Sequence, residues 1–440
     1  MSDYKKIINS IPKDWEVKSI SELGIVIGGG TPTRDISTYW NGNISWITPG
    51  EVSKLNNKFV VNSVDKITEQ GLYASGANLL PEGSLLVTSR ATLGARAICS
   101  KPMATNQGFK SIVFNKRSDA SFYYHFFGLL KTEMARRASG TTFLEISSKE
   151  FSSIPLPYPP DNERTKIAHI LDTVDTEIQQ TELLIEKLQL VKQGLLNDLL
   201  TRGIGVDGQL RPTFQQEPSL YKKSPLGWIP KDWVVSMVSK EFDVNSGITL
   251  GPHRSPNRNP QKYLRVANIH RDQLILNDIS ELEASETEVI NKSIELHDLL
   301  VVEGHASTDE IGRCAIADET VVGMLFQNHL FRLRAKKINP FFGLLWMNSS
   351  FAKHYWRCEA ATSSGLNTIN RTKLNEMHVA VPQPYEQNEI VKVASDSKLR
   401  LQQERCLLSK LQDKKSAIMN DLLTGRVRVE KPLNHNPMAQ

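Results

Sequence analysis

The chain has 440 residues, of which 40% are hydrophobic and 23% are charged, and its formal net charge is +5. This length exceeds what one hydrophobic core usually serves, and the composition excludes a wholly disordered chain. Four cysteines lie far apart without a CxxC pair, which indicates neither a disulfide framework nor a zinc site. Because no apolar run reaches the roughly 18 residues of a membrane span and residues 1–10 lack a signal-peptide core, we expect a cytoplasmic protein without a membrane segment.

The two halves of the chain repeat one another in the same order. Each half opens with the pentapeptide IPKDW, at 11–15 and 229–233, and closes with NDLLT, at 197–201 and 420–424. Between these markers come a variable body, a Ser-Gly turn, a Pro-punctuated strand and a long helical pattern. A repeat of about half the chain is too long for a solenoid, so we expect a duplicated two-part module.

Three tracts within the two bodies contain basic residues and neither Asp nor Glu: 83–118, 244–271 and 320–358. Basic side chains can replace the counterions that condense on nucleic-acid phosphates. The alternative is an ordinary solvated surface. Three such tracts in a nearly neutral chain favour a nucleic-acid partner.

A narrow apolar stripe predicts a long helix at the end of each half. Its residues recur at alternating steps of three and four, which is typical of a coiled-coil seam, and prolines precede each stripe as they often precede a helix start. A helix lying on its own domain is the alternative, but nearly forty residues favour helix-to-helix packing. The seam residues are Ile167, Leu171, Val174, Ile178, Ile185, Leu188, Leu195 and Leu199, then Ile390, Ala394, Leu401, Leu408, Leu411, Ile418 and Leu422, with Lys192 and Lys415 as equivalent polar interruptions.

These patterns predict an α+β chain in which two globular α/β domains, in a pseudo-twofold arrangement, are joined by two long antiparallel helices that form a coiled coil. The first helix connects the domains in sequence, so the second must run back if the two helices pack together. The expected parts are a first domain at 1–160, a helix at 161–202, a linker at 203–228, a second domain at 229–385, a helix at 386–425 and a tail at 426–440.

Particular segments give the chain a resemblance to a known family. They are GGGTPTRDISTYWNGNISWITPGEV at 28–52, LLPEGSLLVTSRATLGARAI at 79–98, ATNQGFKSI at 104–112 and the two segments in which prolines precede a long helix. From about residue 11 to 429, the chain resembles the specificity (S) subunit of type I restriction-modification systems. The second body departs from the pattern, although IGRCAIAD at 311–318 matches LGARAICS at 93–100, and QNHLFRL at 327–333 stands where NQGFKSI stands.

The resemblance implies two target recognition domains that each read one half of a split site in double-stranded DNA. It also implies that the helices space these domains and dock two methyltransferase (M) subunits, and that restriction (R) subunits with a motor join the complex. The chain itself would be no enzyme and would hold no cofactor. S-adenosylmethionine, ATP and Mg would belong to the partner subunits.

Two segments could suggest catalysis by the chain itself. INPFF at 338–342 is similar to the (N/D)PP(Y/F) motif of amino-methyltransferases, but Phe341 replaces the second proline, so a capped helix start is the better interpretation. PDNERTK at 160–166 resembles a nuclease motif, but acids at a helix start explain it better. A self-contained DNA-modifying enzyme and a coiled-coil assembly protein without a DNA role remain the alternatives.

Polar loop residues of the first body are its candidate DNA contacts, because Arg can read guanine and Asn or Gln can read adenine. Trp40, Trp46 and Phe109 are also typical of a core, and Asn106 and Gln107 are also typical of turns. Residues 28–30 indicate a strand end or turn and no phosphate loop. The candidates are Thr31, Thr33, Arg34, Trp40, Asn41, Ser89, Arg90, Thr92, Asn106 and Gln107.

In the second body, most candidate cations would touch phosphates, which position a protein without specifying sequence. A single His is more often structural than functional, so we expect only a few of these residues to meet base edges. The candidates are His253, Arg254, Arg258, Lys262, Arg265, Asn268, His270, Ser307, Arg313, Gln327, Asn328 and His329.

Overall fold

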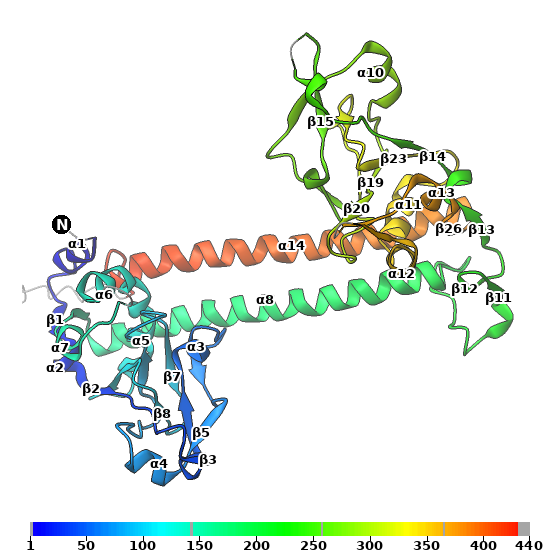
Figure 1. Ribbon diagram of the computed structural model, residues 1–440. Coiled ribbons are helices and arrows are strands. Elements are labelled where there is room, and N and C mark those ends of the chain that lie inside the picture. The colour runs from blue at the N-terminus through cyan, green and yellow to red at the C-terminus, as the bar shows by residue number, and fades with distance from the viewer. Residues whose placement is uncertain (1–2, 141–143, 257, 364–365, 430–440) are drawn as a thin grey trace, which may run out of the picture. The chain divides into compact units, whose positions relative to one another are not determined.

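The computed structural model describes residues 3–140, 144–256, 258–363 and 366–429. The chain folds as two compact units, and each unit contains part of both long helices. Unit 1 comprises residues 1–184 and 404–440, and unit 2 comprises residues 185–403. The predicted mixture of helices and sheets with two long helices is confirmed (Figure 1).

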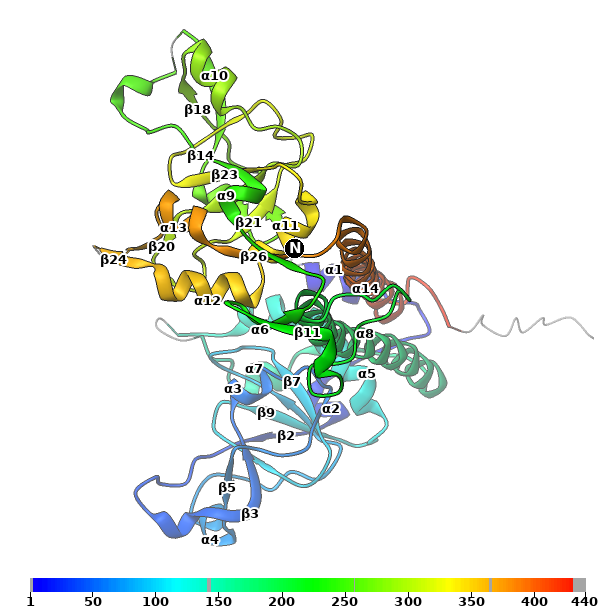
Figure 2. The ribbon, with the colours of Figure 1, turned by 90° about the vertical axis from the view of Figure 1, so that its right-hand side faces the viewer.

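The largest sheet of unit 1 has the strand order β2-β9-β6-β7-β4. It is buried on both faces: Leu85 and Val87 belong to the core that contains helix α5 (Asp119–Phe126), whereas the intervening Leu86 belongs to the core of the opposite face. Figure 2 shows α5 near this sheet. The strands are β2 (Gly24–Gly28), β9 (Lys110–Phe114), β6 (Leu85–Val87), β7 (Arg96–Cys99) and β4 (Phe59–Val60).

A second sheet of unit 1 carries the candidates Trp40 and Asn41, and Asn106 and Gln107 follow its last strand. Its order is β5-β3-β8, with β3 (Trp40–Ile47) antiparallel to β5 (Asp65–Ile67) and parallel to β8 (Ala104–Thr105). Helix α3 (Pro49–Val52) follows β3, and Thr48 caps it through hydrogen bonds to the Glu51 carboxylate. The remaining short helices are α1 (Asp3–Asn9), α2 (Ile20–Leu23), α4 (Glu69–Tyr73), α6 (Lys131–Arg137) and α7 (Ser148–Ser152).

Unit 2 repeats these strand orders despite its different sequence. Its larger sheet has the order β14-β23-β19-β21, and its second sheet has the order β18-β15-β22, in which β15 and β22 are parallel as β3 and β8 are. The divergent second body therefore keeps the frame of the first. The strands are β14 (Phe242–Ser246), β23 (Leu330–Ala335), β19 (Leu299–Val302), β21 (Cys314–Ile316), β18 (Ser280–Glu283), β15 (Pro260–Leu264) and β22 (Leu325–Phe326).

Unit 2 adds elements that unit 1 lacks within the described residues. The added strand pairs are β11 (Tyr221–Ser224) with β12 (Gly227–Pro230) and β16 (Ile269–His270) with β17 (Gln273–Leu274); a three-stranded sheet has the order β20 (Gly304–His305), β25 (Leu366–Thr368), β24 (Ala361–Ser363). Its short helices are α9 (Val238–Glu241), α10 (Glu286–Lys292), α11 (Pro340–Met347), α12 (Ser350–Glu359) and α13 (Arg371–Glu376). Asn339 caps α11 by accepting hydrogen bonds from the amides of Phe341 and Phe342, which confirms INPFF as a helix start.

Each unit joins its body to a long helix through a two-stranded sheet. In unit 1, β1 (Glu16–Ser19) pairs antiparallel with β10 (Pro155–Tyr158), and α8 (Asp161–Thr201) follows. In unit 2, β13 (Val234–Met237) pairs antiparallel with β26 (His378–Val381), and α14 (Pro384–Leu423) follows. IPKDW precedes the first strand of each pair, so the sheet brings both copies of the pentapeptide to the start of a long helix.

The long helices pack through the predicted seam. In unit 1, Glu163 pairs with Arg428 and Asp175 pairs with Lys415, so the α14 positions fall as the α8 positions rise and the two segments run antiparallel. In unit 2, Leu199 shares a core with Ile390. All predicted seam residues, and the polar Lys192 and Lys415 between them, are buried or half-buried. The coiled-coil pattern is thus confirmed within each unit.

Candidate nucleic-acid interface

Several candidates of unit 1 gather around a turn at Gly108, which follows β8. The Gly108 amide donates to Oδ1 of Asn106 at 2.8 Å, and the Ser89 amide donates to the Gly108 carbonyl at 2.8 Å. A Cβ at Gly108 would lie 3.4 Å from Nε of Arg90, so this arginine also borders the turn. Asn106 therefore acts at least as a turn residue, as its sequence allows.

Thr31 and Gln107 extend this group, which we call the Gly108 cluster: Thr31, Ser89, Arg90, Asn106 and Gln107. The Thr31 hydroxyl hydrogen bonds to the side-chain oxygen of Gln107. Ser89 is fully buried, and its hydroxyl has no hydrogen-bond partner in the described part of the chain. Ser89 thus holds the turn from its buried side, whereas the exposed Gln107 can contact a ligand.

A second group lies at the start of β3. The Arg34 guanidinium stacks 3.8 Å from the Trp40 ring centre and donates to the Asp65 carboxylate at 2.6 Å. Trp40 donates from Nε1 to the Thr33 carbonyl at 3.1 Å, and Asn41 has a positive φ of 61°. A stacked guanidinium that is still 57% exposed can contact a phosphate or a base without rearranging.

The neighbouring aromatic residues are core residues, as the sequence predicts. Trp46 is 2% exposed and donates from Nε1 to the Gly30 carbonyl at 2.9 Å, and Phe109 is fully buried. Trp40 is only half-buried and packs edge-on against Trp46. The strand β2 ends at Gly28, so residues 28–30 are a strand end.

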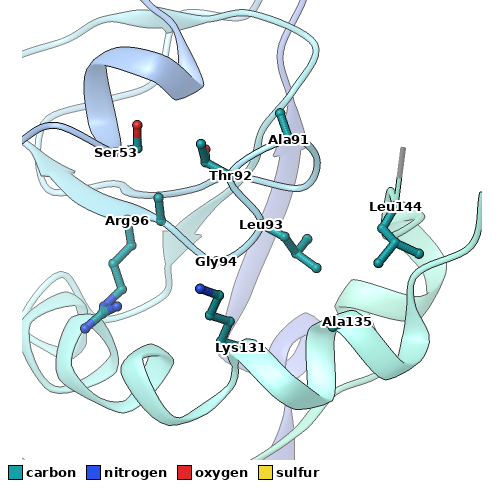
Figure 3. Close-up of a pocket in the computed structure, with 10 residues that line it drawn as sticks. Ser53, Ala91, Thr92, Leu93, Gly94, Arg96, Lys131, Ala135 and Leu144 are labelled. Carbon is teal, nitrogen blue, oxygen red and sulfur yellow. The ribbon is translucent and has the colours of Figure 1, made fainter. Parts of the chain in front are cut away.

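A cavity of about 780 Å³ lies beside the turn between β6 and β7 (Figure 3). Thr92 is the sequence-predicted candidate in its wall. Lys131, on α6, directs its amine toward the Gly94 turn and has no hydrogen bond or ion pair among the described residues. The lining residues are Ser53, Ala91, Thr92, Leu93, Gly94, Ala95, Arg96, Lys131, Ala135 and Leu144.

The two cations of this cavity have different roles. Arg96 donates from Nε to the Tyr124 carbonyl and lies 4.9 Å from the Tyr124 ring centre. Burial lowers the pKa of the Arg96 guanidinium, and its contacts with Tyr124 give it a role within the fold. Lys131 is exposed and remains available to a ligand. Sequence reasoning missed Lys131 because it lies outside the acid-free tracts and two residues before Glu133.

The equivalent turn of unit 2 is longer. It runs over 303–312, ten positions, against six positions for 89–94 in unit 1, and Gly94 and Gly312 both have positive φ, at 84° and 66°. The longer turn carries acids: Asp309 pairs with Arg357 at 2.5 Å, and Glu310 pairs with Arg313 at 3.1 Å. The loops therefore differ in length and charge on a shared frame.

Ion pairs hold three candidate arginines of unit 2. Arg254 donates to both carboxylate oxygens of Glu288 at 2.8 and 2.6 Å, and these bonds lower the pKa of Glu288 to about 2. Arg265 pairs with Asp278 at 2.6 Å. Arg313, which pairs with Glu310, is 7% exposed and also donates to the Val266 carbonyl at 2.9 Å. These guanidinium groups already have carboxylate partners, so each can contribute less to the binding of nucleic-acid phosphates.

Other candidates of unit 2 also have structural partners. Asn268 is 3% exposed, accepts from the Arg265 amide at 2.7 Å and donates to the carbonyls of Ile275 and Asp278, so it holds a turn. His329 lies 2.9 Å from the Glu303 carboxylate, with 56% of its side chain exposed. The Ser307 hydroxyl accepts from the Asp309 amide at 3.3 Å.

Several candidates of unit 2 stay open to solvent or to a ligand. Arg258 and Lys262 are exposed and have no side-chain hydrogen bond or ion pair among the described residues. Gln327 and Asn328 follow β22 as Asn106 and Gln107 follow β8. His270 lies in β16 and is half-buried, and the His253 side chain lies outside the described residues.

Two features that would suggest other classes are not found where the structure describes the chain. Residues 3–140, 144–256, 258–363 and 366–429 contain no group of three or more His, Cys, Asp or Glu side chains placed to hold a metal ion. Within the same ranges, no helix is both long and apolar enough to cross a membrane.

The structure defines a class of protein built from two units with a shared frame and different polar loops, and comparison with known proteins shows which family it resembles. Residues 12–190 match the family model of the type I restriction modification DNA specificity domain. The chain is 32% identical over 246 residues to the MjaIX specificity subunit of Methanocaldococcus jannaschii, which covers 54% of each chain. It is 31% identical over 173 residues to the EcoR124I/EcoR124II specificity subunit of Escherichia coli, which covers 37% of this chain and 42% of the relative.

These two alignments span about half of the relatives' length or less, whereas a third spans nearly all of it. The MjaVIII specificity subunit of M. jannaschii is 24% identical over 432 residues, which covers 96% of this chain and 94% of the relative. Residues 12–190 thus match the DNA specificity domain of type I restriction-modification systems, and nearly the whole chain is similar to a specificity subunit of such a system.

Solved structures of low sequence identity share the fold. The S subunit from M. genitalium superposes with a TM-score of 0.53 at 14% identity, covering 94% of this chain and 96% of that chain. A chain from a study of complex assembly and conformational transition of the type I R-M system gives a TM-score of 0.57 at 15% identity, covering 95% and 99%. The α+β fold class predicted from the sequence is thereby confirmed.

Proposed function

We propose that this chain is the DNA sequence-specificity subunit of a type I restriction-modification complex, and that each recognition domain reads one half of a bipartite site. One observation carries the proposal: the two units share their strand orders, yet their loops differ in length, charge and polar residues. A common frame with different loops is what two unlike half-sites require, because base edges are read by side chains and phosphates by any nearby cation.

The partners follow from the same proposal. Two methyltransferase subunits dock on the chain, restriction subunits with a motor join them, and the paired helices space the recognition domains. The relatives are named as specificity subunits of type I restriction enzymes, and this supports the proposed partner subunits. The complex works in the cytoplasm, where it meets double-stranded DNA.

Under this proposal, the partner subunits catalyse the methylation and restriction reactions. The sequence has no Walker Gly-Lys-Ser/Thr segment, and the two segments that resemble catalytic motifs are both helix starts. S-adenosylmethionine would therefore bind the methyltransferase subunits, and ATP and Mg the restriction subunits. Methyl transfer by the purified chain alone would instead support a self-contained DNA-modifying enzyme.

Mapping methylated adenines tests this function. Cells that carry this gene with its methyltransferase partner should show methylation at one split DNA sequence with an unread gap of constant length. Cells with the methyltransferase alone are the control and should show none of it. Methylation at a continuous site, or the same methylation without this chain, would contradict the proposal.

A further inference from the structure

The first IPKDW ends in Asp14 and Trp15, of which Trp15 binds the start of α8 and Asp14 binds the segment after α14. Trp15 donates from Nε1 to the Glu163 carboxylate at 3.0 Å, and Glu163 is 2% exposed. Arg428, just beyond α14, donates to both oxygens of Glu163 at 2.7 and 2.8 Å and to both oxygens of Asp14 at 2.9 and 2.7 Å. We call Asp14, Trp15, Glu163 and Arg428 the clasp of unit 1.

The second IPKDW builds the same arrangement in unit 2. Trp233 donates from Nε1 to the fully buried Glu386 at 3.1 Å. Arg211 donates to Glu386 at 3.0 Å and to Asp232 at 2.8 Å. We call Arg211, Asp232, Trp233 and Glu386 the clasp of unit 2. The repeated pentapeptide thus encodes a repeated set of contacts.

The segments that connect each helix end to the arginine of its clasp differ in length. Arg428 lies three positions after Gly425, whereas Arg211 lies eight positions after Gly203. In unit 2 a bridge between Ile204 and Leu210 closes the extra loop and returns the chain to the helix end. Both glycines have positive φ, at 70° and 65°, so each helix end turns in the same way before the arginine. Two different segments therefore deliver one guanidinium to one place.

Each clasp joins three segments that are distant in sequence. It links the pentapeptide before the first strand of a body, the first turn of the long helix that follows that body, and the segment that follows the other long helix. A planar guanidinium that binds two carboxylates fixes distance and direction together. The carboxylates of Glu163 and Glu386 are buried, so they hold their arginines strongly. The contacts leave the body little freedom to shift on its helices.

We propose that the two clasps are positioning devices that fix each recognition domain on its helix ends and so restrict the gap that the protein accepts between half-sites. This inference rests on the function proposed above. A domain that can shift on its helix would accept a half-site displaced along the duplex, while its own loops would still read the same bases.

The test uses the full chain together with its methyltransferase partner and maps methylated adenines. The variants are Arg428→Ala, Arg428→Lys and Trp15→Phe for unit 1, with Arg211→Ala and Trp233→Phe for unit 2. The Trp→Phe variants remove the Nε1 donor and part of the ring volume but keep an aromatic ring in the core. The matched controls are Arg426→Ala and Lys223→Ala, because both side chains are exposed and have no partner among the described residues.

In the clasp variants, sites with a gap changed by one base pair should gain methylation at least about tenfold relative to the original site, with unchanged half-site bases. The controls should keep the original gap. A uniform loss of methylation at all sites, with the same gap discrimination in the Trp→Phe variants, would reduce the clasps to structural contacts and overturn the inference. If the unmodified complex methylates no split site, the proposed function itself fails, which is a distinguishable result.

Discussion

Gly203 follows the end of α8 at a point where no side chain fits. Its φ is +65°, and an added Cβ would lie 2.1 Å from Oε1 of Glu386 and 2.5 Å from the Trp233 ring. Gly208 has a similar φ of +75° but open space around it. We expect Gly203→Ala to lower the free energy of unfolding by about 2–4 kcal/mol, and Gly208→Ala by about 1 kcal/mol, as measured by urea denaturation. Equal losses would show that backbone conformation alone matters.

A buried carboxylate on α6 should make the free energy of unfolding depend on pH under acidic conditions. Glu133 accepts hydrogen bonds from Arg136 at 2.7 and 2.8 Å and from Arg137 at 2.8 Å, and it is 2% exposed. The bonds from Arg136, foremost, lower the pKa of Glu133 from 4.5 to about 2. The stabilisation is complete above pH 4.5 and is lost as the pH falls through 2, because the unfolded state takes up the proton first.

Glu133→Gln should therefore remove part of the acid sensitivity. Between pH 5 and pH 2 the unmodified chain should lose on the order of 3 kcal/mol from this group, and the variant should lack this slope while being less stable at pH 7. Thermal melting across this pH range measures the difference. Parallel pH profiles for both chains would contradict the assignment.

Ion pairing should separate cations that contact DNA from cations that serve the fold. Lys131 and Arg258 are exposed and have no side-chain partner among the described residues, whereas Arg254 binds Glu288 through two hydrogen bonds. Lys131→Ala and Arg258→Ala should each lower the log–log salt slope of DNA binding by about 1, because one fewer phosphate is neutralised. Arg254→Ala should change the slope less and stability more. DNA-binding titrations at several salt concentrations distinguish these outcomes.

For single residues, the sequence predicted the local role of a side chain better than it predicted its interaction partners. It indicated that Glu163 opens a helix, and that is correct, but no local pattern indicates that Arg428 binds it from 265 positions away. The sequence did contain a signal that Glu163 and Glu386 are equivalent positions of the two halves. They are 223 positions apart, and so are the two NDLLT segments, at 197 and 420. Likewise, Asn268 and Arg313 resemble readers by type, but their burial and bonds reveal internal roles.

Among the elements, the long helices were the most predictable. Their stripes extend over many turns, so periodicity alone identifies the buried face. The sheets were not predictable in this way, because β4, β8 and β22 have two residues each and are held by distant partners. The expected linker at 203–228 likewise contains strand β11 and the start of its partner β12, and it supplies Arg211 to a clasp.

The seam gives a direct test on one helix. Leu171 is fully buried in the core of unit 1, whereas Leu183, twelve positions later on the same helix, is 59% exposed. We expect Leu171→Ala to lower the free energy of unfolding by about 2–5 kcal/mol and Leu183→Ala to change it by less than about 0.5 kcal/mol. Chemical denaturation monitored by circular dichroism measures both. A large effect at Leu183 would place a second contact surface on the exposed face.

For the whole molecule, the proposed spacer role predicts a change in the DNA site. Removing seven residues from α8 and seven from α14, at facing positions, keeps the seam in register and shortens both helices by about 10.5 Å. That length corresponds to about three base pairs. Methylome mapping should then show the same half-site bases with a shorter unread gap. Changed bases, or an unchanged gap, would contradict the spacer role.

The duplication also shows what whole-chain comparison adds to local reading. The second body shares only short segments with the first, such as IGRCAIAD and LGARAICS, and the predicted common frame rested on these segments and on the repeated order of markers. The strand orders β2-β9-β6-β7 and β14-β23-β19-β21 show that the sheet topology was kept while the polar loops changed. Core positions constrain the fold, whereas exposed loops accept many sequences, and it is the loops that carry the candidate contacts.

The position of Arg428 affects how this protein can be shortened or labelled. A chain cut after Thr424 would keep all of α8 and α14, and secondary structure alone would suggest that nothing important was removed. It would nevertheless leave the buried Glu163 without its counter-charge and remove the link between Asp14 and the segment that follows α14. An affinity tag is therefore better joined beyond residue 429 than directly to the last helical turn.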